Sequence, residues 1–103
     1  MDLRIKEING VFSVFGNLNN QNISQLQEKI TDCFLHRRQA VINLTSLVQM
    51  DNTSAIVLQK LYTNALRRNL NLLIVGRENK IVYNVMTQMC TSYILGESAY
   101  QHS

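Results

Sequence analysis

Apolar and polar residues alternate over the first part of the chain, and this pattern predicts two paired strands. The alternation covers residues 3–8 and resumes over residues 11–15. Asn9-Gly10 separates the two segments, and this dipeptide favours the two-residue turn of an antiparallel hairpin. We therefore expect the fold to open with a hairpin whose second strand ends at Gly16, followed by a polar loop over residues 17–22.

Three later segments carry apolar residues at the 3.6-residue spacing of amphipathic helices. A capping pair, either Ser24 with Gln27 or Asn22 with Gln25, is expected to start the first helix. The apolar positions are Ile23, Leu26, Ile30, Cys33 and Phe34 in the first helix, Leu58, Leu61, Tyr62, Ala65 and Leu66 in the second, which starts near Ala55, and Ile81, Val82, Val85, Met86, Met89 and Cys90 in the third, which starts at Asn79.

Short apolar runs between these helices predict buried strands. Residues 40–44 are apolar, partly β-branched and too few for a helix. Residues 70–75 are almost continuously apolar, which is typical of a strand inside a sheet that is covered on both faces. Residues 93–95 are a candidate for a last short strand. The predicted fold is α/β, with a mixed four- to five-stranded sheet, an N-terminal antiparallel hairpin followed by parallel βα crossovers, and helices packed mainly on one face.

Small polar residues connect the strand at 40–44 to the second helix. Asp51, Asn52, Thr53 and Ser54 have side chains that favour caps and turns because they can bond nearby backbone groups. This cluster lies at the positive end of the helix. The hydroxyls there are therefore either helix caps or a site of modification.

Composition limits the class of protein. The 103 residues, 46% of them hydrophobic and 17% charged, are expected to form one domain over residues 1–103, with residues 96–103 as a loosely ordered tail. No apolar run approaches the roughly 20 residues of a membrane span, so we expect no direct membrane insertion. The first residues lack the apolar core of a signal peptide, which favours a cytoplasmic location.

The net charge of +3 is concentrated in two arginine pairs, Arg37-Arg38 and Arg67-Arg68. Each pair lies near a predicted helix end, where cations suit the carbonyl terminus, and neither is interleaved with aromatic residues as a nucleic-acid surface often is. We expect solvated helix ends and no nucleic-acid partner. An electrostatic contact with an acidic partner is the alternative.

The residue types that carry enzyme chemistry are few and scattered. Cys33 and Cys90 continue apolar stripes and are expected to be buried, reduced thiols. His36 and His102 are isolated, and the chain has no Cys-x-x-Cys pair and no glycine-rich phosphate loop. No hydroxyl of the polar cluster has a histidine nearby in sequence to act as a base. We therefore expect no enzyme activity, no metal and no cofactor.

Three short motifs follow one another along the chain. Gly16-Asn17-Leu18-Asn19 follows the predicted hairpin, Asp51-Asn52-Thr53-Ser54 stands at the start of a predicted helix, and the run at 72–75 ends in Gly76. In these motifs and their order, the chain resembles the STAS domains of bacterial anti-sigma-factor antagonists over residues 1–95. That family has Gly-x-Leu-Asp at the first place, Asp-Ser-Ser-Gly at the second and a glycine at the end of its fourth strand. Asn19, Asn52 and Ser54 depart from the family's pattern.

The resemblance implies a non-catalytic regulatory module that switches partners. In that family the unphosphorylated domain binds a GHKL-type serine/threonine kinase, the anti-sigma factor, and the kinase inactivates it by phosphorylating the second Ser of the motif. A PP2C-type phosphatase reverses this. Thr53 matches the phosphorylated Ser, and Ser54 is the alternative acceptor. For a domain expected to be monomeric, the partner-binding residues would be Asn19, Asp51, Asn52, Thr53, Ser54 and Lys60.

Two alternatives stay open. STAS domains resembling this one also bind the ATPase of lipid-transport ABC systems as accessory subunits, through the same junction and without obligatory phosphorylation. The departures at Asn19, Asn52 and Ser54 favour that alternative. Otherwise Thr53 or Ser54 only caps the helix, which contributes about 1 kcal/mol to stability.

Overall fold

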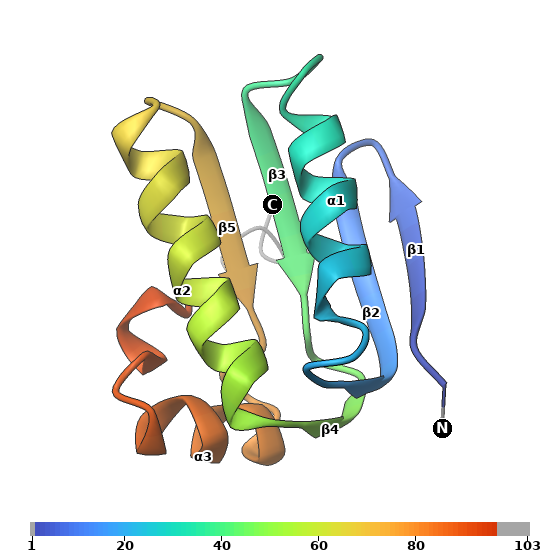
Figure 1. Cartoon of the computed structure of the whole chain (residues 1–103), viewed down its shortest axis with the longest axis vertical. Coiled ribbons are helices and arrows are strands. Elements are labelled where there is room, and N and C mark those ends of the chain that lie inside the picture. Colours follow the sequence, from blue (N-terminus) through green and yellow to red (C-terminus); the bar gives the residue numbers. More distant parts are fainter. Residues whose placement is uncertain (1, 97–103) are drawn as a thin grey trace.

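Five strands form a mixed sheet, and two long helices lie side by side on one of its faces (Figure 1). The structure, a computed structural model, describes residues 2–96. The elements are β1 (Arg4–Ile8), β2 (Val11–Leu18), α1 (Ile23–Cys33), β3 (Gln39–Asn43), β4 (Leu47–Met50), α2 (Asn52–Arg67), β5 (Asn71–Val75), α3 (Lys80–Gln88) and a 3-10 turn at Ser92–Ile94.

The strands follow the order β1-β2-β3-β5 across the sheet, and β4 also pairs with β2. β1 and β2 are antiparallel, whereas the pairings β2–β3, β2–β4 and β3–β5 are parallel. β3 pairs with the first residues of β2, and β4 pairs with its last ones, so two short strands share one long partner. This arrangement confirms the α/β fold, the opening hairpin and the parallel crossovers predicted from the sequence.

The hydrophobic core lies between the sheet and the helices. Every second residue of β2 is buried, because the helices cover one face of the sheet. Leu26 and Ile30 of α1 and Leu58 of α2 are fully buried against this face, together with Ile42 of β3 and Ile74 of β5. Each such aliphatic side chain contributes about 1.5–3 kcal/mol when it leaves water, which fixes the helices on the sheet.

The second strand runs further than predicted, because β4 was not foreseen. Gly16, expected to end the strand, instead lies at an irregularity in the pairing with β4, and β2 continues to Leu18. Gly16 has φ +87°, and a Cβ at this position would overlap the carbonyl oxygen of Asp2. Glycine is therefore needed where the chain passes close to the N-terminal segment, and not because the strand stops.

The C-terminal part of the sheet also differs from the prediction. β5 ends the strand order rather than lying inside it, although Leu72, Ile74 and Val75 are buried as expected. Residues 93–95 do not form a strand: they overlap the 3-10 turn, and Leu95 makes only an isolated parallel bridge with Ile74. This last segment covers β5, which explains why an edge strand has such an apolar sequence.

Several side chains leave the faces predicted for them. Leu66 is exposed, and Cys90 is exposed because it follows the end of α3 in a left-handed conformation, with φ 57°. Asn22 precedes α1, but its side chain does not cap that helix; its Oδ1 accepts the Asn19 backbone N–H instead. Within the expected tail, the Gly96 N–H donates to Ile74, and the rest of the tail, with His102, lies outside the described residues.

Within residues 2–96, no helix is both long enough and apolar enough to cross a bilayer.

Candidate functional site

The Asp51 carboxylate holds two segments together at the start of α2. Its Oδ1 accepts the backbone N–H of Ser54 at 2.8 Å and so caps the helix. Its Oδ2 accepts the backbone N–H of Asn20, also at 2.8 Å, from the loop that follows β2. The Asp51 N–H in turn donates to the Leu18 carbonyl at 3.1 Å. The two motif segments singled out in the sequence therefore meet in one corner, which we call the Thr53 corner and define as residues 19–22 and 51–54.

These contacts lower the pKa of the Asp51 carboxyl group. Partial burial of the carboxylate raises its pKa, but the N–H and hydroxyl of Ser54 and the N–H of Asn20 together outweigh that effect and leave the pKa below its ordinary value. The corner therefore carries a fixed negative charge next to the positive helix end.

The two candidate hydroxyls at the corner have opposite environments. Thr53 is exposed on the first turn of α2, as is Asn52. Ser54 is 0% exposed, and its Oγ makes no hydrogen bond of good geometry with the described residues, although it lies near enough to Asp51 to affect that carboxyl group. Thr53 is therefore accessible on the folded domain, whereas the Ser54 hydroxyl is enclosed by it.

Asn19 orders the loop at the corner. Its carbonyl accepts the N–H groups of Asn22 and Ile23, its Oδ1 accepts the Gln21 N–H at 3.0 Å, and its own N–H donates to the Asn22 side chain. The polar groups of this turn therefore find their hydrogen-bond partners within the turn itself. Asn19 thus shapes the surface beside Asp51 by fixing the loop that reaches it.

Asn79, which the sequence analysis treated only as a helix start, supports the corner from the other side. Its Nδ2 lies within hydrogen-bond distance of the carbonyls of Leu44, Thr45 and Leu47, at 3.0–3.2 Å. Its Oδ1 accepts the first free N–H groups of α3. One side chain therefore caps α3 and fastens the segment that leads into β4. No local pattern indicates this role, since its partners lie 32 to 35 residues away.

The face of α2 that continues from Thr53 is partly open. Lys60 is exposed and lies seven residues further on, about 10 Å along the helix and on nearly the same side. Lys60 therefore places a positive charge on the same face of α2, further along the helix than the carboxylate of Asp51. A partner that covers Thr53 can therefore also contact Lys60.

Exposed apolar residues lie on the elements beside the corner. Val48 of β4 is 42% exposed and Ile81 of α3 is 45% exposed. α3 packs on β4, and β4 leads directly into α2, so these side chains extend the same end of the molecule. The sequence analysis did not identify them, because it placed Ile81 on the buried stripe of its helix and did not foresee β4.

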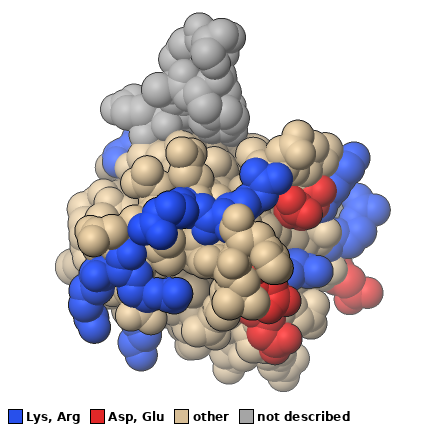
Figure 2. All heavy atoms as spheres, turned by 90° about the horizontal axis from the view of Figure 1, so that it is seen from above, with Lys and Arg blue, Asp and Glu red and all other residues tan. Residues whose placement is uncertain are grey.

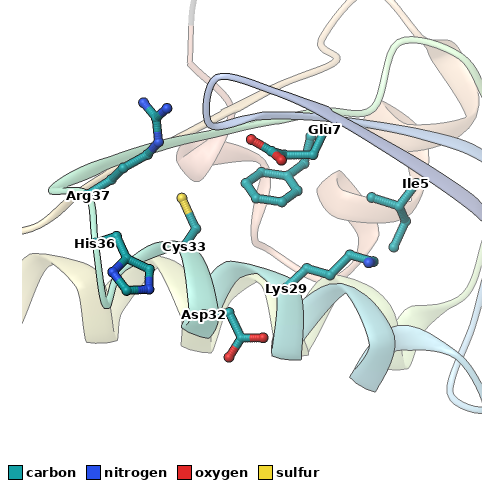
Figure 3. A pocket seen from close by; sticks show the side chains of 8 residues that line it. Ile5, Glu7, Lys29, Asp32, Cys33, His36 and Arg37 are labelled. Carbon is teal, nitrogen blue, oxygen red and sulfur yellow. The ribbon is translucent and has the colours of Figure 1, made fainter.

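A pocket of about 400 Å³ lies elsewhere, between the β1–β2 hairpin and α1 (Figure 3). Cys33 points into it, and Glu7, Lys29 and Arg37 surround it with charges of both signs. Burial raises the pKa of the Cys33 thiol, Arg37 lowers it, and Glu7 raises it again, so that the pKa stays above its ordinary value. A thiol in this state is not an activated nucleophile. Within residues 2–96, no three His, Cys, Asp or Glu side chains are grouped to hold a metal ion.

Comparison with known proteins identifies both a family and a fold. The family model described as STAS domain matches residues 1–88. The solved structure of the anti-sigma factor antagonist SpoIIAA in its unphosphorylated form is similar with a TM-score of 0.71, covering 98% of this chain and 91% of that one, at 14% sequence identity. A search of curated proteins finds no match. At this identity the structural likeness concerns the fold, while the family match concerns the sequence itself.

Proposed function

Because this chain belongs to the STAS domain family, we propose that it is a non-catalytic regulatory module of the anti-sigma-factor-antagonist type, switched off by phosphorylation of Thr53. Its partner would be a GHKL-type serine/threonine kinase that acts as the anti-sigma factor, and a PP2C-type phosphatase would restore binding. The domain would act in the cytoplasm, as a monomer and without a cofactor of its own.

The observation that carries this proposal is the contrast between Thr53 and Ser54. Thr53 presents a hydroxyl on the surface, at the start of a long helix whose N-terminus is already fixed by Asp51. Ser54, the alternative acceptor, is sealed in the core. Phosphorylation at Thr53 requires no unfolding of the domain, and we therefore retain Thr53 alone as the acceptor.

The electrostatics of the corner favour a switch that acts on the partner rather than on the fold. A phosphothreonine adds about −1.5 to −2 charges and three acceptor oxygens at neutral pH. The positive end of α2 tolerates an anion there, so the domain stays folded. The corner already carries the negative charge of Asp51, however. A partner surface that accommodates this one charge would also meet the charges of the phosphate on Thr53. Repulsion and desolvation would then release it.

The surface used would combine the proposed contact residues with the apolar side chains beside them. Asn19, Asp51, Asn52 and Lys60 surround Thr53 with polar groups of both signs. Val48 and Ile81 provide exposed apolar area at the same end. Protein interfaces take most of their affinity from a few well-packed residues, while charged groups set specificity and the rate of association.

A second candidate function is supported by the state of Asn19. Its Oδ1 is bonded within its own loop, and it supplies an amide where the family motif has a carboxylate. The Thr53 corner therefore has one carboxylate fewer than the family motif would give it. This difference favours a partner that stays bound without a phosphorylation switch. This second candidate is an accessory subunit of a lipid-transport ABC system that binds the ATPase without obligatory phosphorylation.

One experiment separates these functions. The protein is captured from its native host with its partner, and the tryptic peptide of residues 39–60, which contains Thr53 and Ser54, is sequenced by mass spectrometry. A GHKL kinase as partner and a phosphate on Thr53 support the proposal. An ABC ATPase as partner, with Thr53 unmodified, supports the second candidate. Phosphate on Ser54 but not Thr53 contradicts the assignment of the acceptor.

A further inference from the structure

Three chain connections meet at the end of the molecule that lies opposite the Thr53 corner. They are the β1–β2 turn, the connection from α1 to β3 and the connection from α2 to β5, which lie along the same end of the sheet in Figure 1. We call this surface the basic end and define it as residues 8–10, 35–38 and 66–69. α2 runs the length of the molecule between the two surfaces, so a partner at one leaves the other free.

The basic end combines the two arginine pairs that are far apart in the sequence. Arg37, Arg38, Arg67 and Arg68 are all exposed. Figure 2 shows Lys and Arg side chains as a band across this end, with acidic side chains at one side of the view. The basic end itself contains no Asp or Glu. The Glu7 carboxylate lies beside the basic end, and its Oε2 accepts the Gly10 N–H at 2.8 Å.

Backbone and side-chain contacts make this end one continuous surface. Arg38 donates from Nη2 to the Asn69 carbonyl at 2.9 Å, and its own carbonyl accepts the Asn71 N–H. On the other side, Arg37 lies against the hairpin turn, since a Cβ built on Gly10 would be 3.3 Å from the Arg37 Cδ. The connection from α1 to β3 therefore joins the other two through Arg37 and Arg38.

Each connection also exposes one aliphatic side chain. Leu35 is 70% exposed, Ile8 is 59% exposed and Leu66 is 58% exposed, and these are the most exposed aliphatic residues among the large hydrophobic side chains of residues 2–96. Single exposed aliphatic residues need no explanation, but three on one surface, two of them within two residues of an arginine, indicate a contact surface. Capping of helix ends accounts for the arginines only in part, because two helix C-termini carry about one negative charge between them.

We propose that the basic end binds the surface of an anionic lipid bilayer. Guanidinium groups match phosphate oxygens, and the negative surface potential of such a membrane attracts each of them. The three aliphatic side chains would enter the boundary between headgroups and acyl chains. The three side chains come from separate connections and do not form one continuous apolar patch. A fluid lipid layer can take up such separate side chains, whereas a folded protein would need a pocket for each of them.

Other polyanions fit the surface less well. A nucleic acid would leave the aliphatic side chains without a role, and residues 8–10, 35–38 and 66–69 include no Phe, Tyr or Trp on which a base could stack. An acidic protein would need three apolar contacts in a fixed arrangement. On a membrane, by contrast, α2 would stand on the lipid with its N-terminus outermost, so that Thr53 remains open to its partner.

The test uses the full chain and sedimentation with vesicles of 30% phosphatidylglycerol in phosphatidylcholine. We expect binding to these vesicles, none to pure phosphatidylcholine, and a decrease as salt is raised. Arg37→Glu and Arg67→Glu should each weaken binding by at least about fivefold. Lys80→Glu makes the same charge change on α3 and should leave binding unaltered. Leu35→Ser with Leu66→Ser should weaken it without any change in charge.

Specific outcomes would overturn this proposal. They are equal binding to neutral vesicles, no binding to anionic ones, or an equal loss with Lys80→Glu. Binding of polyglutamate or of a single-stranded oligonucleotide in place of the anionic vesicles would assign the basic end to an acidic protein or to nucleic acid. Thr53→Asp should leave vesicle binding unchanged, so failure here is distinguishable from failure of the phosphorylation switch.

Discussion

The Asp51 carboxylate accepts the backbone N–H of Asn20 at 2.8 Å, although 31 residues separate them. The same carboxylate caps α2 through the Ser54 N–H. The loop after β2 and the start of α2 are thereby fixed as one surface before any partner binds. A prearranged surface reduces the entropy lost on association.

Replacing Asp51 should therefore destabilise the domain more than loss of a cap alone. Asp51→Ala removes the cap of a 16-residue helix and leaves the Asn20 N–H without its acceptor. We expect the free energy of unfolding to fall by about 1–2 kcal/mol, measured by urea denaturation at pH 7. The adjacent, exposed Asn52→Ala is the matched control and should change it by less than about 0.5 kcal/mol. Equal effects would show that neither the cap of α2 nor the bridge to Asn20 contributes measurably to stability.

The contribution of Asp51 should also depend on pH in a defined direction. Hydrogen bonding outweighs burial and leaves the pKa of the folded carboxyl below its unfolded value. A lowered pKa gives stability that is present above the unfolded value, about 4, and is lost as the pH falls through the folded one. The stability difference between the natural chain and Asp51→Ala should thus be constant near pH 7 and shrink below about pH 4. A difference that grows on acidification would contradict this.

Ser54 offers a test of its burial. Its hydroxyl is fully enclosed and has no well-formed hydrogen bond to any of residues 2–96, and an unsatisfied buried polar group costs about 1–3 kcal/mol. Ser54→Ala should leave the free energy of unfolding unchanged or raise it by up to about 1 kcal/mol in the same urea measurement. A loss of more than about 1 kcal/mol would mean that the hydroxyl has a stabilising partner.

The role of Asn79 can be divided between its two polar atoms. Asn79→Asp keeps an oxygen that caps α3 but places a carboxylate against the carbonyls of Leu44, Thr45 and Leu47. We expect both Asn79→Asp and Asn79→Ala to lower the melting temperature, the former at least as strongly. If Asn79→Asp melted like the natural chain, the contacts of Nδ2 with the three carbonyls would add nothing to the stability that helix capping provides.

Leu72 and Asn71 are neighbours on β5 with opposite exposure, and the same substitution distinguishes them. Leu72→Asp puts an unpaired charge into the core, whereas Asn71 is exposed and Asn71→Asp changes only the surface. Circular dichroism should show an unfolded chain for the first and a cooperative melt for the second. Cooperative melting of both would mean that β5 is not covered as described.

Local patterns in the sequence account for most of the fold. Asn9-Gly10 and the alternation of β2 specify the hairpin, and helical spacing places Leu26, Ile30 and Leu58 in the core. β4 escaped prediction because Leu47–Met50 buries only its first and last residues, which gives no alternation over four positions. Its existence depends on pairing with the end of β2, a contact that no local pattern indicates.

Some features of the candidate site can likewise be predicted from the sequence, and others depend on the fold. The cluster at 51–54 and its position at a helix start follow from residue types, and the phase of α2 could have distinguished the hydroxyls. Ser54 lies four residues before the buried Leu58 and eleven before the buried Ala65, so it shares their face, while Thr53 does not. The bonds from Asn20 and Asn79 could not be foreseen, since both depend on segments brought together only by the fold.

The central claim is that charge at Thr53 controls binding, and one measurement tests it directly. The affinity of the captured kinase is measured for the natural chain, Thr53→Ala and Thr53→Asp, each first shown by circular dichroism to be folded. The account predicts that Thr53→Ala binds like the natural chain and that Thr53→Asp binds at least about tenfold more weakly, because a second negative charge beside Asp51 opposes the partner. Equal affinity of Thr53→Asp and the natural chain would contradict it.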